Sequence, residues 1–309
     1  MNQNSPRVID TVIPAFNALP LVGATVAALL EQQLPAGYSL TITVVDDGSS
    51  DGTENYLKER FGDRILIIRH DPNRGRSAAC NTGAEHGAGE FLLFLDSDCL
   101  PANNRFIQEH IHALEAAAKI SCGLISSEKQ GFWPEYQRQL VKKRLKGLDN
   151  TDAATSFTTA NTVVARDCFE KAGGFNTSYT HYGFEDRDLL LRLQQTGASV
   201  HYTPAAAVNH DDDINLSAVC NKMRLSGRYS SRLFAEQHPE SYRTMPYYRF
   251  DGRLNPWMRY ISPVSSRALP YLTALFEPVL EVRWIPVGLR GVLVRLASAL
   301  AYLEGTCKS

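Results

Sequence analysis

The segment Glu90–Asp98 is the feature that most constrains the fold of this chain. Five consecutive apolar residues, Phe91 to Leu95, follow Gly89-Glu90 and end at two aspartates, Asp96 and Asp98, separated by one serine. An apolar run of that length predicts a strand buried on both faces, as in a parallel sheet covered by helices. Ligands of open α/β sheets bind beyond the carboxyl ends of the strands, where these carboxylates fall. Paired carboxylates there suit a divalent cation that also holds phosphate oxygens. Taken alone, Asp-Ser-Asp is explained more simply by a solvated acidic turn.

Strands and helices alternate through the first half of the chain. The expected strands are Val8–Pro14, Leu40–Val45, Ile65–Arg69 and Phe91–Leu95, and the expected helices are Leu21–Gln33, a helix starting near Thr53, Ser77–His86 and Asn104–Ala118. This alternation predicts βαβ units and a parallel sheet with right-handed crossovers. The second strand also ends at two aspartates, Asp46 and Asp47. We therefore expect both acidic strand ends to face a common crevice.

Three further strands are expected, near Ile120–Ile125, at Phe157–Ala165 and at Val200–Thr203. The basic segment Trp133–Leu148 predicts a helix with a solvated face, or alternatively a patch that faces an acceptor or a membrane. Asn161 falls in the middle of its expected strand. A buried asparagine needs hydrogen-bond partners, so a ligand-facing role and a structural role both remain open.

Two polar clusters follow in the second half. Glu185 to Asp188 come directly after Gly183-Phe184 and open a helix. Acidic residues in a first turn complement the helix dipole, but four ionisable residues behind a glycine favour a functional site. His210 lies beside Asp211–Asp213, and imidazole is a common metal ligand, although a lone histidine is more often structural.

The alternation ends at Ile214, which predicts a catalytic domain over residues 1–213 and a mainly helical extension over 214–309. Leu216–Gln237 is expected to be helical. Leu272–Leu303 is apolar, with prolines and arginines among the hydrophobic residues. It fits either a pair of helices packed on the domain or an amphipathic segment on a membrane surface with Trp284 at the interface, and we favour the second.

Composition excludes several classes of protein. The 309 residues carry a net charge of −1, so no basic excess indicates nucleic acid as a partner. Six cysteines without metal-like spacing predict buried thiols in a reducing cytoplasm. Met1–Pro6 has no apolar core of a signal peptide, and no apolar stretch has the length of a spanning helix. We expect a cytoplasmic protein, with peripheral contact at the inner face of the cell membrane as the alternative for its C-terminal segment.

The motifs form an ordered series. It runs Val-Ile-Pro-Ala-Phe-Asn, Val-Val-Asp-Asp-Gly-Ser-Ser-Asp-Gly-Thr, Asn73-x-Gly75-x-x-x-Ala79-x-Asn81-x-Gly83, Phe-Leu-Asp-Ser-Asp, Gly-Gly-Phe-Asn, Gly-Phe-Glu-Asp-Arg-Asp-Leu and Val-Asn-His. In this order the chain resembles the family 2 glycosyltransferases, inverting enzymes with a GT-A fold, over about Val8 to Asp213. The resemblance implies a Rossmann-like, mixed but mainly parallel sheet flanked by helices.

The resemblance also implies a site for a nucleotide-sugar donor, most commonly a UDP-sugar in this family, with dTDP- and GDP-sugars also used. The residues implied for the donor are Pro14, Ala15, Phe16, Asn17, Asp46, Asp47, Arg76, Asn81, Asp96 and Ser97. Asp47, or its neighbour Asp46, would accept a hydrogen bond from the base. The family usually has arginine where this chain has Cys80, so Arg76 would contact the phosphates instead.

Metal and catalytic roles follow from the same resemblance. Asp98 would bind Mn²⁺ or Mg²⁺ bridging the diphosphate, Asp96 would hold ribose or metal-bound water, and His210 would be a third ligand. The implied acceptor-side residues are Asn161, Gly173, Gly174 and Phe175. Asp186 would be the catalytic base, with Glu185 beside it contacting the acceptor. A cation stabilises the leaving diphosphate, and a carboxylate can deprotonate the attacking hydroxyl.

These features predict a transferase that moves sugar to a glycan or lipid-linked acceptor in cell-surface polysaccharide synthesis. Two alternatives remain. A nucleotidyltransferase activating a sugar phosphate would be expected to carry a glycine- and basic-rich phosphate loop near the first strand, and Pro14 to Asn17 offer none. A non-catalytic carbohydrate-binding protein on the same fold would have lost an acidic motif, and all of them are present.

Overall fold

The computed structural model describes residues 6–116, 118–146, 157–210 and 214–308. The chain forms two compact units. Unit 1 comprises Met1–Ser127, Asn150–Thr177 and Leu189–Asp211, and unit 2 comprises Glu128–Asp149, Ser178–Asp188 and Asp212–Ser309. The chain passes from unit 1 to unit 2 for the last time after Asp211, and the boundary was predicted at residue 213. Unit 2 also contains Glu128–Asp149 and Ser178–Asp188, which the prediction assigned to the catalytic domain.

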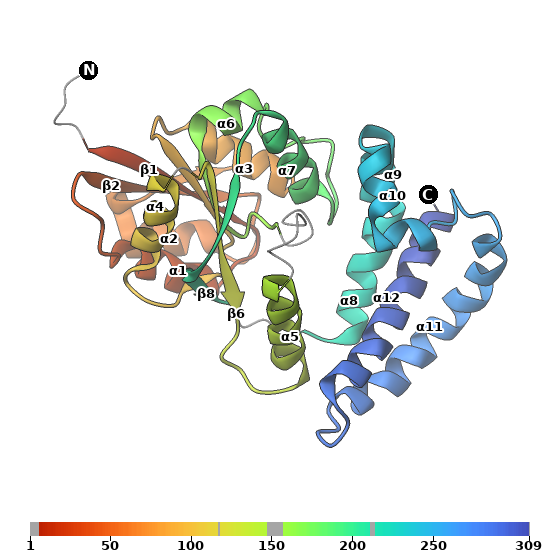
Figure 1. The fold of residues 1–309 in the computed structure, drawn as a ribbon. Helices are drawn as coiled ribbons and strands as arrows, with labels where there is room; N and C mark the ends of the chain where they lie inside the picture. The colour runs from red at the N-terminus through yellow and green to blue at the C-terminus, as the bar shows by residue number, and fades with distance from the viewer. Residues whose placement is uncertain (1–5, 117, 147–156, 211–213, 309) are drawn as a thin grey trace. The chain divides into compact units, whose positions relative to one another are not determined.

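Unit 1 is built on a mixed sheet whose strand order is β3-β2-β1-β4-β7-β6-β8-β5 (Figure 1). The strands are β1 (Arg7–Ala15), β2 (Tyr38–Asp46), β3 (Leu66–Arg69), β4 (Phe91–Leu95), β5 (Leu100–Pro101), β6 (Ile120–Ser126), β7 (Asn161–Ala165) and β8 (Val200–Asn209). Among the described residues, four strand pairings are parallel and three, all involving β5 or β7, are antiparallel. This confirms the predicted mixed, mainly parallel sheet.

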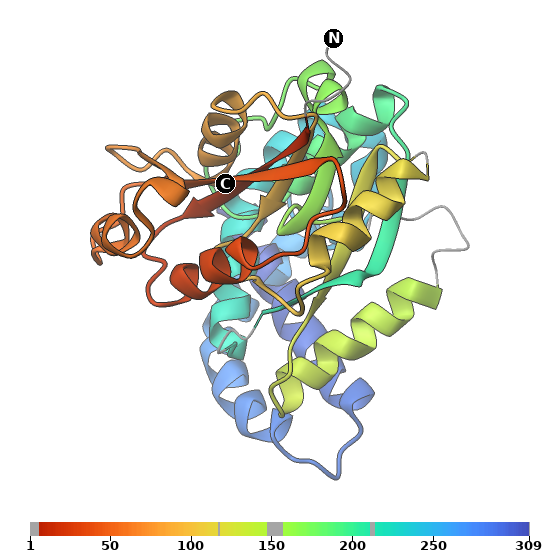
Figure 2. The same cartoon turned by 90° about the vertical axis from the view of Figure 1, so that its left-hand side faces the viewer.

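Helices flank the sheet of unit 1 as the alternation predicts. They are α1 (Leu21–Leu30), α2 (Thr53–Phe61), α3 (Arg76–Glu85), α4 (Phe106–Glu115), α6 (Arg166–Lys171) and α7 (Glu185–Gln195), the last beginning in unit 2. Right-handed crossovers bring α1 and α2 to one face and α3 to the other (Figures 1 and 2). At Gly83 a Cβ would lie 2.4 Å from Cγ1 of Val12, so α3 packs closely on β1.

Strand β4 is buried along its whole length, as expected of its five apolar residues. Two later strands differ from the expectation. β7 begins at Asn161 rather than Phe157 and runs antiparallel to β4. β8 continues six residues past the predicted end at Thr203, because a register irregularity opposite Gly123/Leu124 lets pairing resume at Ala207 beyond Pro204.

Unit 2 is helical. Its elements are α5 (Phe132–Lys146), α8 (Leu216–Leu225), the π-helical turn η3 (Ser226–Ser230), α9 (Ser231–Gln237), α10 (Pro239–Thr244), the 3₁₀ helix η4 (Pro246–Phe250), α11 (Met258–Leu280) and α12 (Val287–Cys307). The predicted helix over Leu216–Gln237 is thus interrupted by η3. Phe132 and Trp133 at the start of α5 are buried in the apolar core of unit 2, so that end of the basic helix is not solvated.

The apolar C-terminal stretch forms the helices α11 and α12, which pack on α8. Prolines 263, 270 and 278 lie inside α11 rather than breaking it, and Pro286 precedes α12. No helix in the described ranges is both long and apolar enough to cross a bilayer. All six cysteines are free thiols and five are buried, as predicted.

Candidate active site

The carboxyl ends of three parallel strands meet at one edge of the sheet. Ala15 at the end of β1 pairs with Asp46 at the end of β2, and β4 runs beside β1 in parallel. The segments that follow these strands, which begin with Phe16, Asp47 and Asp96, therefore leave the sheet on the same side. The two acidic strand ends thus lie at one edge of the sheet, and the common crevice expected there stays a prediction. Phe16 is 54% exposed there, unusual for a phenylalanine.

Both aspartates at the carboxyl end of β2 are buried and hold neighbouring segments. Asp46 accepts hydrogen bonds from Arg69 Nη1 at 2.6 Å and from the Ser49 backbone N–H at 2.9 Å. Asp47 accepts from the backbone N–H groups of Arg74 and Gly75 at 2.9 and 2.8 Å. The Asp47 contacts order the loop before α3, and the Asp46 contacts link the end of β2 to β3 and to the turn at Ser49.

Two residues at this edge, Asn17 and Ser97, are held by hydrogen bonds to their backbone groups. Asn17 has a left-handed backbone (φ 49°), its N–H donates to Ser49 Oγ at 2.9 Å, and its side-chain oxygen accepts from Ser50 N–H at 2.8 Å. The carbonyl of Ser97 accepts a hydrogen bond from Thr25 Oγ1 at 3.0 Å. The turns that carry Phe16 and the Asp-Ser-Asp motif are therefore fixed by side chains from other segments.

Arg76 connects the first turn of α3 to the Asp-Ser-Asp motif. Its Nε and Nη2 donate to Oδ1 of Asp96 at 3.1 and 2.6 Å, and its Nη1 donates to Thr159 Oγ1 at 2.9 Å. About a third of each side chain in the Arg76–Asp96 pair is exposed. The pair thus presents a cation and a carboxylate together, where the resemblance predicts contact with ribose and phosphate.

Asn81 and the predicted acceptor-side turn form one structural connection. The Asn81 amide donates to the Phe175 carbonyl and accepts from the Phe175 N–H, both at 2.8 Å. Gly173 and Gly174 adopt positive φ angles of 78° and 67°, which allows the tight turn before Phe175. Phe175 is buried against Phe94. Asn81 therefore fixes the Gly-Gly-Phe turn. The sequence predicted Asn81 near the nucleotide but did not predict its contact with Phe175.

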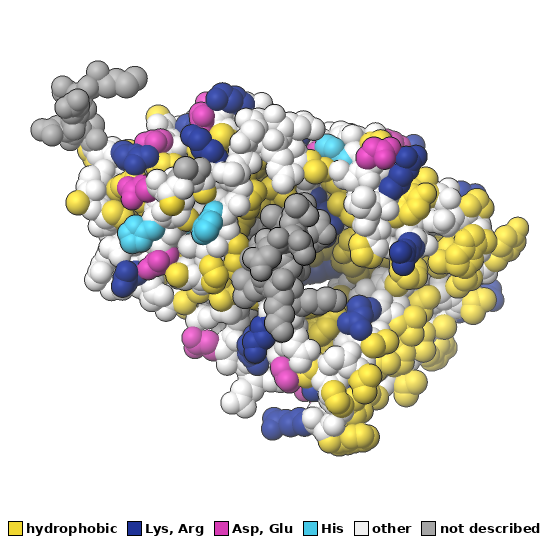
Figure 3. All heavy atoms as spheres, in the orientation of Figure 1, with side chains coloured by type: hydrophobic (Ala, Val, Ile, Leu, Met, Phe, Trp, Pro, Cys, Tyr) yellow, Lys and Arg dark blue, Asp and Glu magenta, His cyan; other side chains and the backbone are white. Residues whose placement is uncertain are grey.

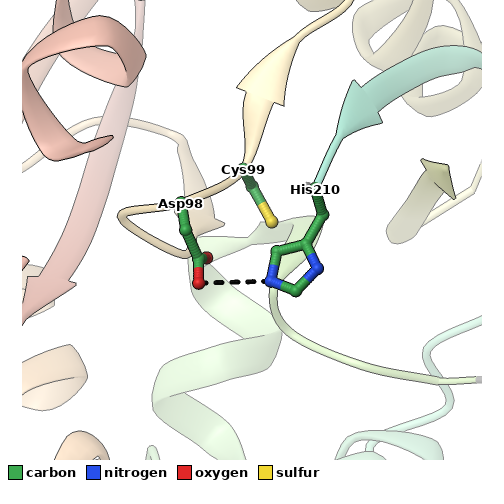
Figure 4. A group of neighbouring side chains, drawn as sticks. All are labelled: Asp98, Cys99 and His210. Carbon is green, nitrogen blue, oxygen red and sulfur yellow. Dashed lines mark ion pairs between the residues drawn. The ribbon is translucent and has the colours of Figure 1, made fainter. Parts of the chain in front are cut away.

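Asp98, Cys99 and His210 converge because β5 pairs with β8 (Figure 4). Leu100 lies opposite Asn209 in antiparallel register, so the residues before Leu100 meet the residue after Asn209. Nε2 of His210 lies 3.1 Å from Oδ2 of Asp98, and one ligand atom from each of the three residues lies within 4.8 Å of the others. The His210 N–H donates to the Ser126 carbonyl at 2.7 Å, which fixes the backbone.

The donor atoms of this cluster fit a divalent cation. A carboxylate oxygen and an imidazole nitrogen suit Mn²⁺, whereas Mg²⁺ prefers oxygen ligands alone. The Cys99 thiol is fully buried and had not been predicted, although it adjoins Asp98 in the sequence. Asp96, the other predicted ligand, accepts hydrogen bonds from Arg76. Asp211–Asp213, which the sequence placed beside His210, lie outside the described residues.

Asn161 belongs to the core of unit 1. Its amide donates to the carbonyls of Leu124 and Ala206 at 3.2 and 3.0 Å, and its oxygen contacts Nε2 of His110 at 3.0 Å. His110 in turn contacts Ser121 Oγ at 2.8 Å. Asn161 is only 1% exposed. Of the two roles left open for it, the structure supports the structural one, and the predicted acceptor-side role has no exposed surface from which to act.

Glu185 and Asp186 begin α7 after a sharply bent segment in unit 2. Gly183 and Phe184 both have positive φ angles, 100° and 71°, and for a phenylalanine this conformation is strained. Phe184 is buried against Phe234. Both acidic side chains at the helix start are partly exposed. The packed Phe184 therefore fixes the place where the two carboxylates leave the turn.

Asp188, the last acidic residue of this cluster, points into unit 2. It is buried, and its Oδ1 lies 2.8 Å from Nε2 of His238. His238 is fifty positions away and carried no sequence signal of this contact. Asp188 therefore has a packing role in unit 2, and the base role that the resemblance implies for Asp186 stays a prediction.

The fold and the acidic strand ends define a GT-A type glycosyltransferase. Residues 10–173, more than half of the chain, match the family described as "Glycosyl transferase family 2". Residues 143–212 match the family described as "N-terminal domain of galactosyltransferase". The chain belongs to glycosyl transferase family 2. This confirms the resemblance seen in the ordered motifs.

Similar proteins include an uncharacterized glycosyltransferase, YfnE, of Bacillus subtilis, which is 26% identical over 69% of this chain and 70% of its own length. The pre-mycofactocin glycosyltransferase of Mycobacterium tuberculosis is 27% identical over 82% of this chain. The chain spans 53% of that relative's length.

Two solved structures share the fold. The mannosyltransferase PcManGT from Pyrobaculum calidifontis, in complex with GDP-Man and Mn²⁺, superposes with a TM-score of 0.61 at 19% identity, over 98% of this chain and 86% of its own. Staphylococcus aureus TarS 1-349 in complex with UDP gives 0.53 at 15% identity, over 97% of this chain and 90% of its own.

Proposed function

We propose that the chain is a metal-dependent, inverting glycosyltransferase that transfers a sugar from a UDP-sugar to a hydroxyl of a glycan or lipid-linked acceptor in cell-surface polysaccharide synthesis. The observation that carries the proposal is the Asp98–His210 pair at 3.1 Å beside the Asp-Ser-Asp turn. A carboxylate and an imidazole brought together at the carboxyl edge of an α/β sheet suit a cation that accompanies a diphosphate.

Asp98 and His210 would hold the cation, Mn²⁺ in preference to Mg²⁺. When bound, the cation stabilises negative charge developing on the diphosphate leaving group. The presence of Mn²⁺ with GDP-Man in PcManGT supports this choice. Cys99 would lie behind the ligands as a buried thiol, since soft sulfur is a poor partner for Mn²⁺.

The donor would bind along the edge formed by β1, β2 and β4. The exposed ring of Phe16 offers a face for the base, supported by the Asn17 turn. Arg76 and Asp96 offer a cation for phosphate and a carboxylate for ribose hydroxyls, and because they contact each other their orientation is fixed before the donor binds. UDP bound to TarS, and the UDP-Glc donor in the name of an Escherichia coli relative, 32% identical over 29% of this chain, favour a uridine nucleotide.

Asp186 would act as the catalytic base. A carboxylate within hydrogen-bond reach of the acceptor hydroxyl removes its proton as the new C–O bond forms. The hydroxyl oxygen attacks the anomeric carbon, the bond to the nucleoside diphosphate breaks, and the anomeric centre inverts in one displacement. The strained Gly183-Phe184 turn supports this role, since backbone strain concentrates at functional sites. Glu185 would contact the acceptor.

The test is Asp186→Asn in the full chain, with sugar transfer and nucleotide-sugar binding measured separately. Loss of the base is expected to lower kcat by about 10²- to 10⁴-fold and to leave donor binding unchanged. Asp167→Asn, at an exposed first-turn carboxylate of α6 that pairs with Lys171, is the matched control. Wild-type turnover by Asp186→Asn would reject the base assignment.

We also propose peripheral membrane contact through unit 2. Large apolar side chains are exposed along α11 and α12 and in the turn between them (Figure 3). We call this set the apolar face: Tyr260, Val264, Tyr271, Leu275, Trp284, Leu289, Val292 and Leu296. Within each helix they recur three, four or seven residues apart, which is one side of a helix.

Charge favours an anionic lipid surface as the partner of the apolar face. Four exposed arginines, Arg259, Arg267, Arg283 and Arg295, lie on these helices and the turn between them, against two glutamates in residues 252–303, although the whole chain carries −1. Tyrosine and tryptophan prefer the boundary between lipid headgroups and hydrocarbon, and Trp284 is 85% exposed. A basic, aromatic-rich amphipathic surface of this kind lies in the plane of a bilayer rather than across it. A lipid-linked acceptor is consistent with such a location.

A further inference from the structure

We propose that unit 2 contains a binding pocket for a phosphate-bearing sugar, centred on Arg228, Arg232 and Lys308. The pocket has a volume of about 430 Å³. Small-molecule sites commonly have volumes of a few hundred Å³ and combine aromatic walls with a few polar groups. None of the residues that line this pocket belongs to the donor, metal or base sites considered above.

The lining is positively charged. Among the described residues, the lining includes three cationic side chains and no carboxylate side chain. Arg232 pairs with Glu236 at 2.9 Å and Lys308 pairs with Glu304 at 2.7 Å, so their charges are partly balanced. Arg228 forms no ion pair within the described part of the chain, and its guanidinium lies 5.2 Å from the centroid of the Tyr229 ring. A phosphate dianion would be the anionic partner of the Arg228 guanidinium.

The rare π-helical turn η3 presents Arg228, Tyr229 and Ser230 to the pocket. Such turns insert an extra residue into a helix, weaken its hydrogen bonding and are frequent at functional sites. The Ser230 hydroxyl lies 3.0 and 3.1 Å from the carbonyls of His181 and Tyr182. This contact ties η3 to the segment that contributes Ser178, Thr180 and His181 to the lining, so the π turn is part of how the pocket is assembled.

Two glycines bring α12 against η3. A Cβ at Gly227 would lie 2.5 Å from the Tyr302 carbonyl oxygen, and one at Gly305 would lie 2.2 Å from the Arg224 carbonyl oxygen. Both contacts are with backbone, which cannot rotate away. The close approach fixes the end of α12, and Lys308 follows directly after that end. The three basic residues therefore come from elements held in fixed register within unit 2.

Aromatic rings and hydroxyls complete the pocket. The rings of His181 and Tyr229 stack with centroids 3.9 Å apart and an interplanar angle of 15°. Ser178 and Thr180 also line the pocket. Flat rings and hydroxyls suit a sugar, whereas the arginines suit the phosphate attached to it. The ligand would be either a free sugar phosphate or a sugar phosphate within an acceptor, and the second case rests on the proposed transferase function.

Titration calorimetry of the full chain tests the pocket directly, with glucose 1-phosphate, inorganic phosphate and glucose as probes in chelator and without nucleotide. Glucose 1-phosphate is expected to bind more tightly than inorganic phosphate, and glucose is expected to show no binding. Arg228→Gln should weaken glucose 1-phosphate binding at least tenfold. Arg249→Gln, at an exposed arginine of η4, should not change it.

The outcomes separate the pocket from the active site. Unchanged binding by Arg228→Gln, or no binding by the wild type, overturns the proposal, and equal affinity for inorganic phosphate overturns the sugar component. Lys308→Gln is the second variant, and thermal unfolding checks that both variants fold. Nucleotide release from a UDP-sugar without acceptor should be unaffected in Arg228→Gln. If Arg228→Gln lost both nucleotide release and glucose 1-phosphate binding, Arg228 would belong to the donor site and the proposal of a separate pocket would be overturned. If the wild type released no nucleotide, the calorimetric test would still decide the proposal.

A transfer assay distinguishes the two sources of the phosphate. If the pocket holds a phosphate within the acceptor, glucose 1-phosphate should inhibit transfer competitively against a lipid-diphosphate-linked sugar acceptor, and Arg228→Gln should raise the KM for that acceptor without changing the KM for the donor. If the pocket holds a free sugar phosphate, glucose 1-phosphate binds but does not compete with that acceptor. Competition against the donor in place of the acceptor would contradict both cases.

Discussion

Nε2 of His210 lies 3.1 Å from Oδ2 of Asp98, although the two residues belong to distant parts of the sequence. The contact arises from β5, a strand of two residues whose pairing with β8 sets Leu100 opposite Asn209. A carboxylate and an imidazole at this distance can share either a proton or a cation. The first case gives a local ion pair, whereas the second makes activity depend on a divalent metal.

Asp98→Asn and His210→Gln are expected to remove metal-dependent nucleotide release. The loss should be about 100-fold for each, because a bound cation contributes several kcal/mol of stabilisation to the departing diphosphate. Release of UDP is measured across a Mn²⁺ titration. His201→Gln, at an exposed histidine of the same strand β8, is the control. Full activity in EDTA would show instead that the pair shares only a proton.

The sequence predicted the parts of the site that depend on strand ends. An apolar run followed by aspartates identified β2 and β4 and the edge they share, because that pattern is local. The proximity of Cys99 to His210 was not predictable in the same way, since it needs the short β5–β8 pairing. The contact of Asp188 with His238 likewise depends on tertiary packing in unit 2. The π turn at Ser226–Ser230 was not predicted, because the sequence of Leu216–Gln237 fits the spacing of an uninterrupted α-helix.

Stability is expected to fall below neutral pH through His110. Burial lowers the pKa of His110 to about 4, against the opposing effect of its contact with Asn161. In the unfolded chain His110 has a pKa of about 6.5, whereas in the folded protein the ring is not protonated until the pH falls to about 4. This contribution is therefore fully present above pH 6.5 and is lost as the pH falls toward 4. Between pH 7 and pH 5 the loss amounts to about 2 kcal/mol.

Urea unfolding of the wild type and of His110→Gln at pH 7 and pH 5 measures this effect. The variant is expected to be less stable than the wild type at pH 7, because its amide replaces the ring in a closely packed network with Ser121 and Asn161. Its stability should nevertheless change less between the two pH values. An equal pH dependence in both proteins would assign the effect to other groups.

The link between Asn81 and Phe175 is expected to stabilise unit 1. Asn81→Ala leaves the backbone N–H and carbonyl of the buried Phe175 without these hydrogen bonds, at a cost of about 1–3 kcal/mol. Gly174→Ala should also destabilise, because its φ of 67° is unfavourable and the new Cβ would lie 2.8 Å from Oδ1 of Asn81. Combining the two removes that clash, so the double variant should lose less stability than the sum of the single ones. Additive losses in urea unfolding would contradict the contact.

The apolar face of α11 and α12 is expected to bind anionic vesicles. Phosphatidylglycerol vesicles should co-sediment with the chain and neutral phosphatidylcholine vesicles should not, because the basic residues around the face each contribute about 1 kcal/mol near an anionic surface. Raising the salt concentration should weaken binding by screening. Tyr271→Ser with Trp284→Ser should lower it further at any salt concentration, since both rings are largely exposed and little packing is lost. Leu66→Ser, at an exposed apolar residue of β3, is the control. Vesicle binding that both variants retain equally would show that the membrane is not the partner of this face.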